Sequence, residues 1–323
     1  PVTILGKSIE VVRGTSVVVG LLGVASLMLA LKWFFATRLW WAGGLVMATL
    51  PAWFLHSRTA FETAMMVGFY AVFVLAYLLY REVSPRWLPY AVIAGAATFY
   101  SYSNGQGVMF VTCLLLLVAD WRYHWRVIRS DRTALITGLI ALVLVAGPYL
   151  RFRFVLHPEM MDAHLADLET YWITDIPMTQ KLATFATTYL GGMRPGYWVR
   201  EGVTERFGDR VLGAPGLPLW LSPLIAIGLA LSVWRSPRSP AHRLVLIAIL
   251  AAPFSASIAG LRITRLLAMM VPATLLAVVG LDRVRQWMHR WFSDKAFAAG
   301  IGLILVATTT TMAHDALVNG PLW

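Results

Sequence analysis

The sequence predicts an all-α protein, a polytopic bundle of transmembrane helices. Of its 323 residues, 59% are hydrophobic and only 13% are charged, whereas soluble domains carry about 25% charged residues. The mean hydropathy is +0.68. Apolar stretches of roughly 20 residues recur along the chain, which is typical of membrane-spanning helices. These stretches are continuous and do not alternate with polar residues, which disfavours a β-barrel.

About ten spans are expected, because each apolar run is bounded by basic residues, prolines or short polar turns. The first span starts after Arg13 and ends before Lys32, and the sixth lies between Arg132 and Arg151. In chain order the expected spans are 14–31, 39–55, 62–80, 87–103, 107–120, 133–150, 217–234, 244–259, 266–281 and 296–312.

The spans form one membrane domain over residues 1–323, with one long connection. A six-span half (1–150) and a four-span half (217–323) flank this connection, which covers 151–216. The segments HPEMMDAHLADLETYW (157–172) and TQKLATFATTYLGG (179–192) place apolar residues at helical spacing on one face. They predict amphipathic helices that lie in the membrane interface.

The distribution of Lys and Arg predicts the orientation in the membrane. Alternate loops carry most of the short-loop basic residues, namely 32–38, 81–86, 122–132, 235–243 and 283–295. Loops rich in Lys and Arg stay on the cytoplasmic side. Both chain ends, the long connection and the remaining short loops are then extracytoplasmic.

Composition and residue pattern argue against nucleic-acid binding, a disulfide framework and transport. The net charge is +11, but the basic residues lie in short loops between spans, so they indicate membrane orientation and not binding of nucleic acid. The single cysteine, Cys113, excludes an internal disulfide framework. A transporter is the third alternative; it is disfavoured because no charged residue lies at mid-span and no span is broken by paired Gly and Pro.

Arg58 and Glu62 stand at the joint between two apolar runs on the predicted outer side. An arginine beside a span needs an aqueous surface or an anion. If one helix continued through the joint, the two residues would be i, i+4 neighbours, and Glu62 would hold Arg58. A structural role and a functional role are equal alternatives for Arg58.

Arg262 and Arg265 lie in a very short outer loop, where basic residues oppose the usual bias. They would share a helix face if the following span starts early. Arginine suits bidentate contact with phosphate, so we favour a specific lipid phosphate over general headgroup contact. Tyr100 and Tyr102, in the turn YSYSNGQG (100–107), form a hydroxyl-rich rim, for which an aromatic belt with a turn is the favoured explanation.

The sequence assigns no cofactor, and a divalent metal stays an open alternative. His157, Glu159, Asp162 and His164 carry groups that bind metals, but their spacing fits no strong metal signature. We therefore assign no metal ligand.

Several segments resemble a known family of membrane enzymes. GKSIEVVRGTSVVVGLLGV (6–24) and LPAWFLHSRTAFET (50–63) resemble the entry into a membrane helix and the "P…SR" segment of GT-C-type glycosyltransferases, which use polyprenyl-phosphate sugars. FGDRVLGAPGLPLWLSPLIAIGL (207–229) and LRITRLLAMMVPATLLAVVGLDRV (261–284) are similar to the family's run from an outer loop into a later span and to its "R-Y-x-x-x-x-x-P" helix. The relatives in question are protein O-mannosyltransferases and lipid A aminoarabinose transferase, and the similarity is collinear over nearly the whole chain.

The resemblance implies an inverting glycosyltransferase, a transferase of the cell envelope. A sugar on a polyprenyl phosphate would pass to a glycan, lipid or protein acceptor on the extracytoplasmic face, with surrounding membrane lipids as further partners. Arg265, assisted by Arg262 and Arg58, would bind the lipid phosphate, while Glu62, Tyr100 and Tyr102 would line the cavity. Glu62 follows Arg58 by four places, where the family has an acid at about five, and Leu266 replaces the family's aromatic residue.

The family's catalytic acid follows its first transmembrane helix, and the resemblance implies that this acid would precede Pro1. Glu10 is the only acidic residue before the first expected span, and its motif context differs. Two interpretations stay open: an incomplete sequence of an enzyme, or a shortened, non-catalytic relative that serves as a lipid-binding membrane subunit. The composition and the resemblance favour a bacterial inner membrane.

Overall fold

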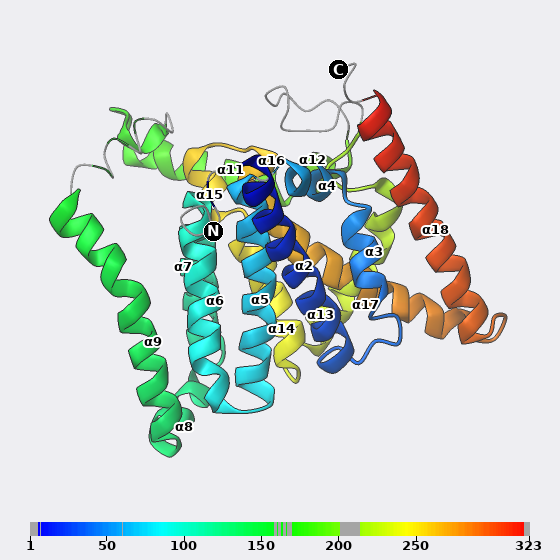
Figure 1. Ribbon diagram of the computed structural model, residues 1–323, viewed down its shortest axis with the longest axis horizontal. Coiled ribbons are helices and arrows are strands. Elements are labelled where there is room, and N and C mark those ends of the chain that lie inside the picture. Colours follow the sequence, from blue (N-terminus) through cyan, green and yellow to red (C-terminus); the bar gives the residue numbers. More distant parts are fainter. Residues whose placement is uncertain are drawn as a thin grey trace.

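The computed structural model describes residues 6, 8–59, 61–157, 160, 163, 166, 170–200 and 214–319, and within these ranges the chain forms helices and no strand. Figure 1 shows the bundle. Its α-helices are α2 (Ile9–Trp33), α3 (Ala42–Ala48), α4 (Pro51–Arg58), α5 (Glu62–Glu82), α6 (Leu88–Ser101), α7 (Ser103–Ala119), α8 (Trp121–Ser130), α9 (Arg132–Arg151), α11 (Met178–Met193), α12 (Pro195–Val199), α13 (Ser222–Arg235), α14 (Pro240–Ala251), α15 (Phe254–Ala259), α16 (Ile263–Leu266), α17 (Met270–Met288) and α18 (Asp294–His314). The all-α fold class is therefore confirmed.

Fewer full-length spans are present than the expected ten. Among the described residues, six helices are long and apolar enough to cross a membrane, or seven if α7 and α8, which are bent by 79°, count as one span. The six are Ile9–Trp33, Glu62–Glu82, Arg132–Leu156, Pro240–Ala259, Ile263–Met288 and Asp294–Val318. The number ten is not confirmed.

The expected span 39–55 shows one reason for the difference. It is divided into α3 and α4, because Pro51 begins a new helix and Leu50 before it is extended (φ −83°, ψ 110°). Proline has no N–H for the preceding turn and disfavours helical backbone at the residue before it. Elsewhere, the expected span 217–234 corresponds to a shorter apolar helix, Leu219–Arg235.

The core is centred on the span Ile263–Met288, which includes α17; 94% of the residues in its most apolar segment are buried. A close crossing of α13 and α17 depends on two glycines. A Cβ atom on Gly228 would lie 2.0 Å from the carbonyl oxygen of Leu276, and one on Gly280 would lie 2.0 Å from that of Leu224. Small residues allow backbones to approach closely where helices pack in a membrane. The two helices therefore form a tightly packed unit.

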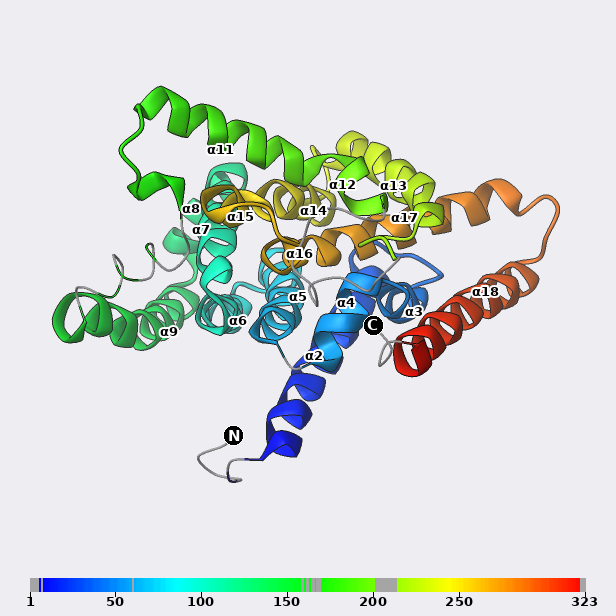
Figure 2. The ribbon, with the colours of Figure 1, turned by 90° about the horizontal axis from the view of Figure 1, so that it is seen from above.

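The two ends of the bundle differ. Figure 1 shows α4, α12, α15 and α16 together at one end, which we call the α16 end, and α8 at the opposite end, the α8 end. Seen from above, α11 crosses the α16 end at a large angle to the long helices (Figure 2). The connections that carry most of the short-loop basic residues lie at the α8 end.

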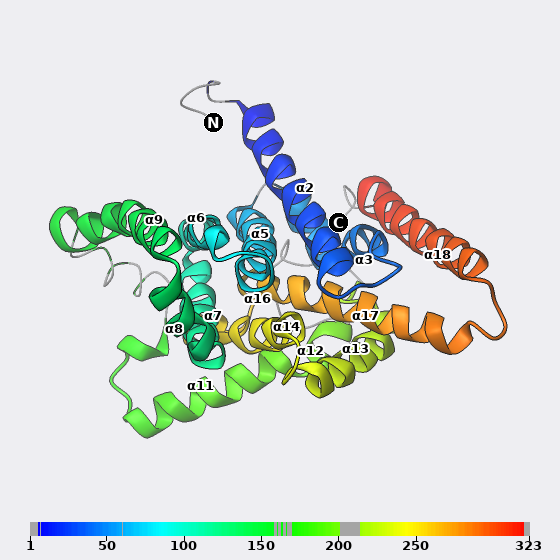
Figure 3. The same cartoon turned by 90° about the horizontal axis from the view of Figure 1, so that it is seen from below.

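A helix is present where one was predicted at 179–192, as α11 (Met178–Met193). The one expected at 157–172 falls largely outside the described residues, and its described C-terminal part forms a short 3-10 helix, Tyr171–Ile173. Figure 3 shows α9 and α18 on opposite flanks of the bundle. The most apolar segments of these spans are only 17% and 11% buried, respectively.

Candidate functional site

Arg265 is the most deeply placed of the predicted site arginines, with 7% of its surface exposed. Its Nη1 donates to the carbonyl oxygens of Ala259 and Gly260, the latter at 3.2 Å. Gly260 ends α15 with φ +92°, a conformation that favours glycine. The turn thereby directs the last carbonyls of α15 toward the guanidinium, and these contacts orient the cation.

The two carbonyls before Ala259 are also satisfied by side chains. Tyr171 donates its hydroxyl hydrogen to the carbonyl of Ser257 at 2.7 Å, and Thr170 donates to that of Ile258. The last carbonyls of a helix have no partner within it and need donors from elsewhere. Thr170 and Tyr171 therefore stabilise the C-terminal end of α15 through hydrogen bonds from another segment of the chain.

Asn104, in the first turn of α7, connects this helix to Arg265 in α16. It is 4% exposed, and its Nδ2 donates to the carbonyl oxygen of Arg265 at 3.2 Å. Ser255 donates its hydroxyl hydrogen to the Asn104 carbonyl at 2.9 Å. The structure thus brings together two segments, YSYSNGQG and LRITR, that the sequence analysis placed on the same side of the membrane.

Tyr102 lies beside Arg265, between the end of α6 and the start of α7. Burial raises the pKa of the Tyr102 phenol; the Arg265 charge and hydrogen bonds with Thr264 and Arg265 oppose this effect, and the Glu62 charge adds to it. These influences mean that the charges of Glu62 and Arg265 both act on the same phenol. Tyr102, Glu62 and Arg265 therefore form one neighbourhood of phenol, carboxylate and guanidinium.

Tyr100 is directed elsewhere. Its hydroxyl donates to the carbonyl of Val145 on α9, and the side chain lines a cavity between α6, α7 and α9. Because α6 ends at Ser101 and Tyr102 is extended (φ −157°, ψ 145°), the two tyrosines leave the turn in different directions. The structure does not bring Tyr100 to Arg265.

The interpretation of Arg58 and Glu62 as i, i+4 neighbours on one helix is wrong. α4 ends at Arg58 and α5 starts at Glu62, so the helix is interrupted between them. Both residues are exposed, and in the part of the chain that the structure describes no ion pair joins them. The Arg58 guanidinium lies 5.6 Å from the centre of the Phe54 ring.

Arg262 is half-buried and precedes α16 with an extended backbone (φ −148°, ψ 146°). Its carbonyl accepts from the backbone N–H groups of Arg265 and Leu266 at 3.0 and 3.1 Å. The expectation that Arg262 and Arg265 share a helix face is therefore wrong, because Arg262 lies before the first turn. Across the described ranges, its guanidinium makes no hydrogen bond or ion pair.

The metal alternative gains no support. Glu159, Asp162 and His164 lie outside the described residues, whereas His157 is described and follows the 152–156 segment. Among the residues with described positions, no group of three or more His, Cys, Asp or Glu side chains could hold a metal ion.

A buried ionic cluster at the α8 end was not predicted from the sequence. Asp120, 4% exposed, accepts a hydrogen bond from the Tyr77 hydroxyl at 2.7 Å and pairs with Arg243, while Arg81 Nε lies 3.5 Å away. The sequence signal for this cluster was Asp120 itself, a single acidic residue at the end of an apolar run. A buried carboxylate needs a cationic or hydrogen-bonding partner. The cluster joins α5, α7 and α14.

Comparison with solved structures finds a similar fold. The chain resembles ArnT from Cupriavidus metallidurans, whose crystal structure was determined bound to undecaprenyl phosphate, with a TM-score of 0.58 and 15% sequence identity. The likeness covers 98% of this chain and 58% of that chain, so this chain spans a little over half the length of its neighbour. No protein-family model and no curated protein sequence matches this chain.

At this sequence identity the likeness shows the fold alone. The apolar helices and the neighbour define an integral membrane protein with a GT-C-like helical fold. The GT-C-like architecture inferred from the sequence motifs is thereby confirmed.

Proposed function

We propose that this chain belongs to an inverting glycosyltransferase that moves a sugar from a polyprenyl-phosphate carrier to an acceptor on the extracytoplasmic face. Arg265 is the main ligand for the lipid phosphate, and Arg262 assists it. The acceptor is a glycan, a lipid or a protein. The polybasic loops support a cytoplasmic α8 end and an extracytoplasmic α16 end, and we propose a bacterial inner membrane.

The observation that carries this proposal is the way in which Arg265 is held. The guanidinium is buried and oriented by the Ala259 and Gly260 carbonyls. A guanidinium presents five N–H donors in a fixed planar fork. Phosphate suits this planar fork. The crystallised neighbour of similar fold binds undecaprenyl phosphate, which supports the assignment.

The reaction needs charge stabilisation at the leaving group. An acidic residue takes a proton from an acceptor hydroxyl, whose oxygen attacks the anomeric carbon. The bond from that carbon to the phosphate oxygen breaks, and the lipid phosphate leaves with the bonding electrons. Preorganised cations stabilise the charge that develops there. No residue of this chain is assigned as the catalytic acid. Glu62 and Tyr102 border the phosphate site, and Arg58 lies exposed at the same end.

Binding of undecaprenyl phosphate to the protein in nanodiscs tests the phosphate site. Arg265→Gln keeps an amide that can donate to the carbonyls but removes the charge. We expect affinity to fall about tenfold to a hundredfold, because hydrogen bonds to charged groups contribute about 1.5–3 kcal/mol. Arg290→Ala is the matched control: Arg290 is exposed in the α17–α18 connection. Equal affinity for wild type and Arg265→Gln would remove the assignment.

A second measurement separates the enzyme from its alternative, a non-catalytic lipid-binding subunit. Vesicles containing the protein are given undecaprenyl-phosphate hexoses and pentoses, together with membrane extract as the acceptor source. Release of undecaprenyl phosphate that depends on Arg265 supports the transferase. Tight binding of undecaprenyl phosphate without release from any donor supports the subunit.

A further inference from the structure

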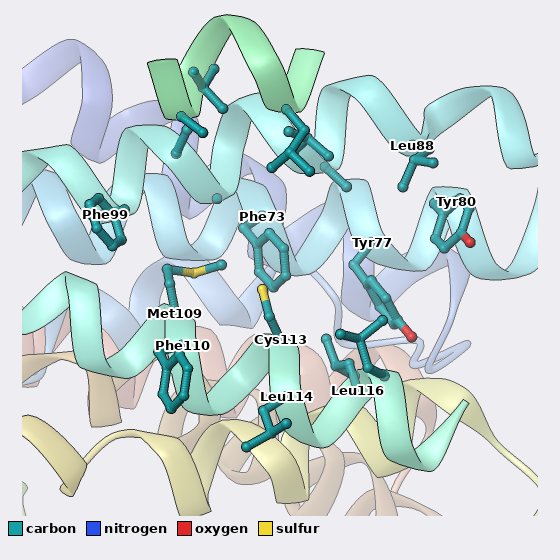
Figure 4. Close-up of a pocket in the computed structure, with 18 of the residues that line it drawn as sticks. Phe73, Tyr77, Tyr80, Leu88, Phe99, Met109, Phe110, Cys113, Leu114 and Leu116 are labelled. Atoms are coloured by element: carbon teal, nitrogen blue, oxygen red, sulfur yellow. The ribbon is translucent and has the colours of Figure 1, made fainter. Parts of the chain in front are cut away.

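A second feature lies outside the proposed phosphate site. A cavity of about 570 Å³ opens between α5, α6, α7 and α9, a volume typical of small-ligand sites. Figure 4 shows Phe73, Phe99 and Phe110 among its labelled side chains. The lining is almost entirely apolar, with its few polar groups on tyrosines, Cys113 and His124.

The cavity is set among membrane-spanning segments. Its walls include α5 and α9, both candidate spans, and α9 contributes little to the buried core. Leu142, Val145 and Tyr149 of α9 close the outer side. An apolar space of this kind excludes water and is filled favourably by hydrocarbon. The occupant that the surroundings supply is the acyl chain of a membrane lipid.

The cavity reaches the α8 end. Leu116 and Leu117 near the end of α7 and His124 of α8 line it, and α8 is bent by 79° from α7. The Asp120 cluster described above fixes this bend, because Asp120 is bound to Tyr77 and Arg243 on neighbouring helices. The head of a lipid whose chain lies in the cavity would therefore be level with α8.

The surface of α8 is strongly basic. Arg122, Arg126 and Arg129 follow each other at i, i+4 and i+7, so they share one face, and all three are exposed. Within the described residues, none of them forms an ion pair. Of the two carboxylates that flank α8, Asp120 is paired with Arg243 and Asp131 accepts a hydrogen bond from the Ala134 N–H.

Two tryptophans beside the arginines of α8 suit the membrane interface. Trp121 and Trp125 are 58% and 50% exposed. The guanidinium groups of Arg122 and Arg129 lie 5.7 Å and 4.6 Å from the centres of these rings, respectively. Tryptophan and arginine in one short helix are typical of helices at the level of lipid headgroups.

We propose that this is a binding site for an anionic phospholipid. One acyl chain occupies the cavity between α6, α7 and α9, and the phosphate lies against Arg122, Arg126 and Arg129. Clustered arginines beside membrane helices attract anionic headgroups. The site is at the opposite end of the bundle from Arg265, so it is independent of the proposed sugar donor and does not rest on the proposed function.

Native mass spectrometry of the purified protein tests whether the α8 arginines bind the lipid headgroup, with phosphatidylglycerol and phosphatidylcholine as probes. We expect wild type to retain phosphatidylglycerol preferentially. The triple variant Arg122→Gln/Arg126→Gln/Arg129→Gln should retain it about a hundredfold less tightly, from about fivefold for each charge removed. The control is Arg235→Gln/Arg238→Gln/Arg290→Gln, which removes the same charge from exposed positions. Equal loss in both triple variants would overturn the site.

The reactivity of Cys113 tests whether an acyl chain occupies the cavity. It is the only cysteine in the sequence and lines the cavity, where Figure 4 shows it near Phe73. Bound phosphatidylglycerol should slow its alkylation by N-ethylmaleimide several-fold in wild type, and it should not do so in the α8 triple variant. Retention of phosphatidylglycerol with unchanged alkylation would exclude the cavity as the chain site. Protection by undecaprenyl phosphate alone, lost in Arg265→Gln, would assign the cavity to the donor lipid and overturn the proposal.

Discussion

Asn104 and Arg265 are joined by a hydrogen bond of 3.2 Å, from the Asn104 amide to the Arg265 carbonyl oxygen, across 161 positions of sequence. The contact connects the first turn of α7 to α16. Because the bonded carbonyl belongs to Arg265 itself, Asn104 sets the backbone from which the proposed phosphate ligand extends.

Replacing Asn104 by alanine should weaken phosphate binding more than it lowers the stability of the fold. The variant Asn104→Ala leaves a buried carbonyl without its donor, which costs about 1–3 kcal/mol, and allows the Arg265 backbone to shift. We expect weaker binding of undecaprenyl phosphate and a modestly lower melting temperature. Ser101→Ala is the control, because the Ser101 hydroxyl bonds only within its own helix, to Ala97. Unchanged binding by Asn104→Ala would mean that the contact has no part in positioning Arg265.

Gly260→Ala tests whether the end of α15 orients Arg265. Its φ of +92° and ψ of 150° lie in a region that is essentially restricted to glycine and disfavours a residue with a Cβ atom by about 1–3 kcal/mol. Relaxation of the turn would move the carbonyls that hold the guanidinium. We expect reduced affinity for undecaprenyl phosphate in nanodiscs. Gly14→Ala serves as the control, since a Cβ at Gly14 meets nothing within 4 Å. Wild-type affinity in Gly260→Ala would argue against carbonyl anchoring.

Asp120→Asn should be among the more destabilising single changes at the α8 end. Removing one partner of a buried ion pair leaves the other uncompensated, which costs about 3 kcal/mol or more. Thermal unfolding in detergent measures the effect. The comparison variant is Glu82→Gln, whose carboxylate contacts Arg81 at 3.5 Å near the surface and should change stability by about 1 kcal/mol or less. Similar melting temperatures for the two variants would show that the Asp120 cluster does not stabilise the fold.

Two glycine substitutions should have opposite effects on stability. In Gly228→Ala the new Cβ meets backbone 2.0 Å away, so α13 must separate from α17, at a cost of about 1–3 kcal/mol. In Gly300→Ala, on α18, the Cβ meets nothing within 4 Å, and helix propensity favours alanine by up to about 1 kcal/mol. Thermal unfolding of both variants checks the sign. A stabilised Gly228→Ala would contradict the close crossing.

Hydropathy predicted most of the helical segments, because burial in lipid requires long apolar runs wherever the chain crosses. Hydropathy overestimated the number of full-length spans, because it does not register a break in the backbone within an apolar run. Pro51, which divides the expected span 39–55, was a readable signal in the sequence. The interruption between Arg58 and Glu62 was not readable, because residue spacing gives neighbours on a helix only if the helix continues.

The site was predicted in part. That the segments carrying Glu62, Tyr102 and Arg265 reach the same end of the bundle follows from the alternation of spans. The divergence of Tyr100 from Tyr102 depends on one extended residue, and the role of Asn104 depends on a contact between distant segments. No periodicity in a single sequence encodes such contacts, nor does it show that Asp120 would find its partner on α14.

Arg265 is also joined without interruption to the most deeply buried helix. α16 continues through a 3-10 turn, Leu267–Met269, into α17, which is locked against α13 by the close crossing at Gly228 and Gly280. Sites of low local stability supply the conformational motion in proteins, and densely packed helices do not. Arg265 is thus a fixed reference point. Any closure around a bound lipid is therefore expected from elements outside the tightly packed unit of α13 and α17.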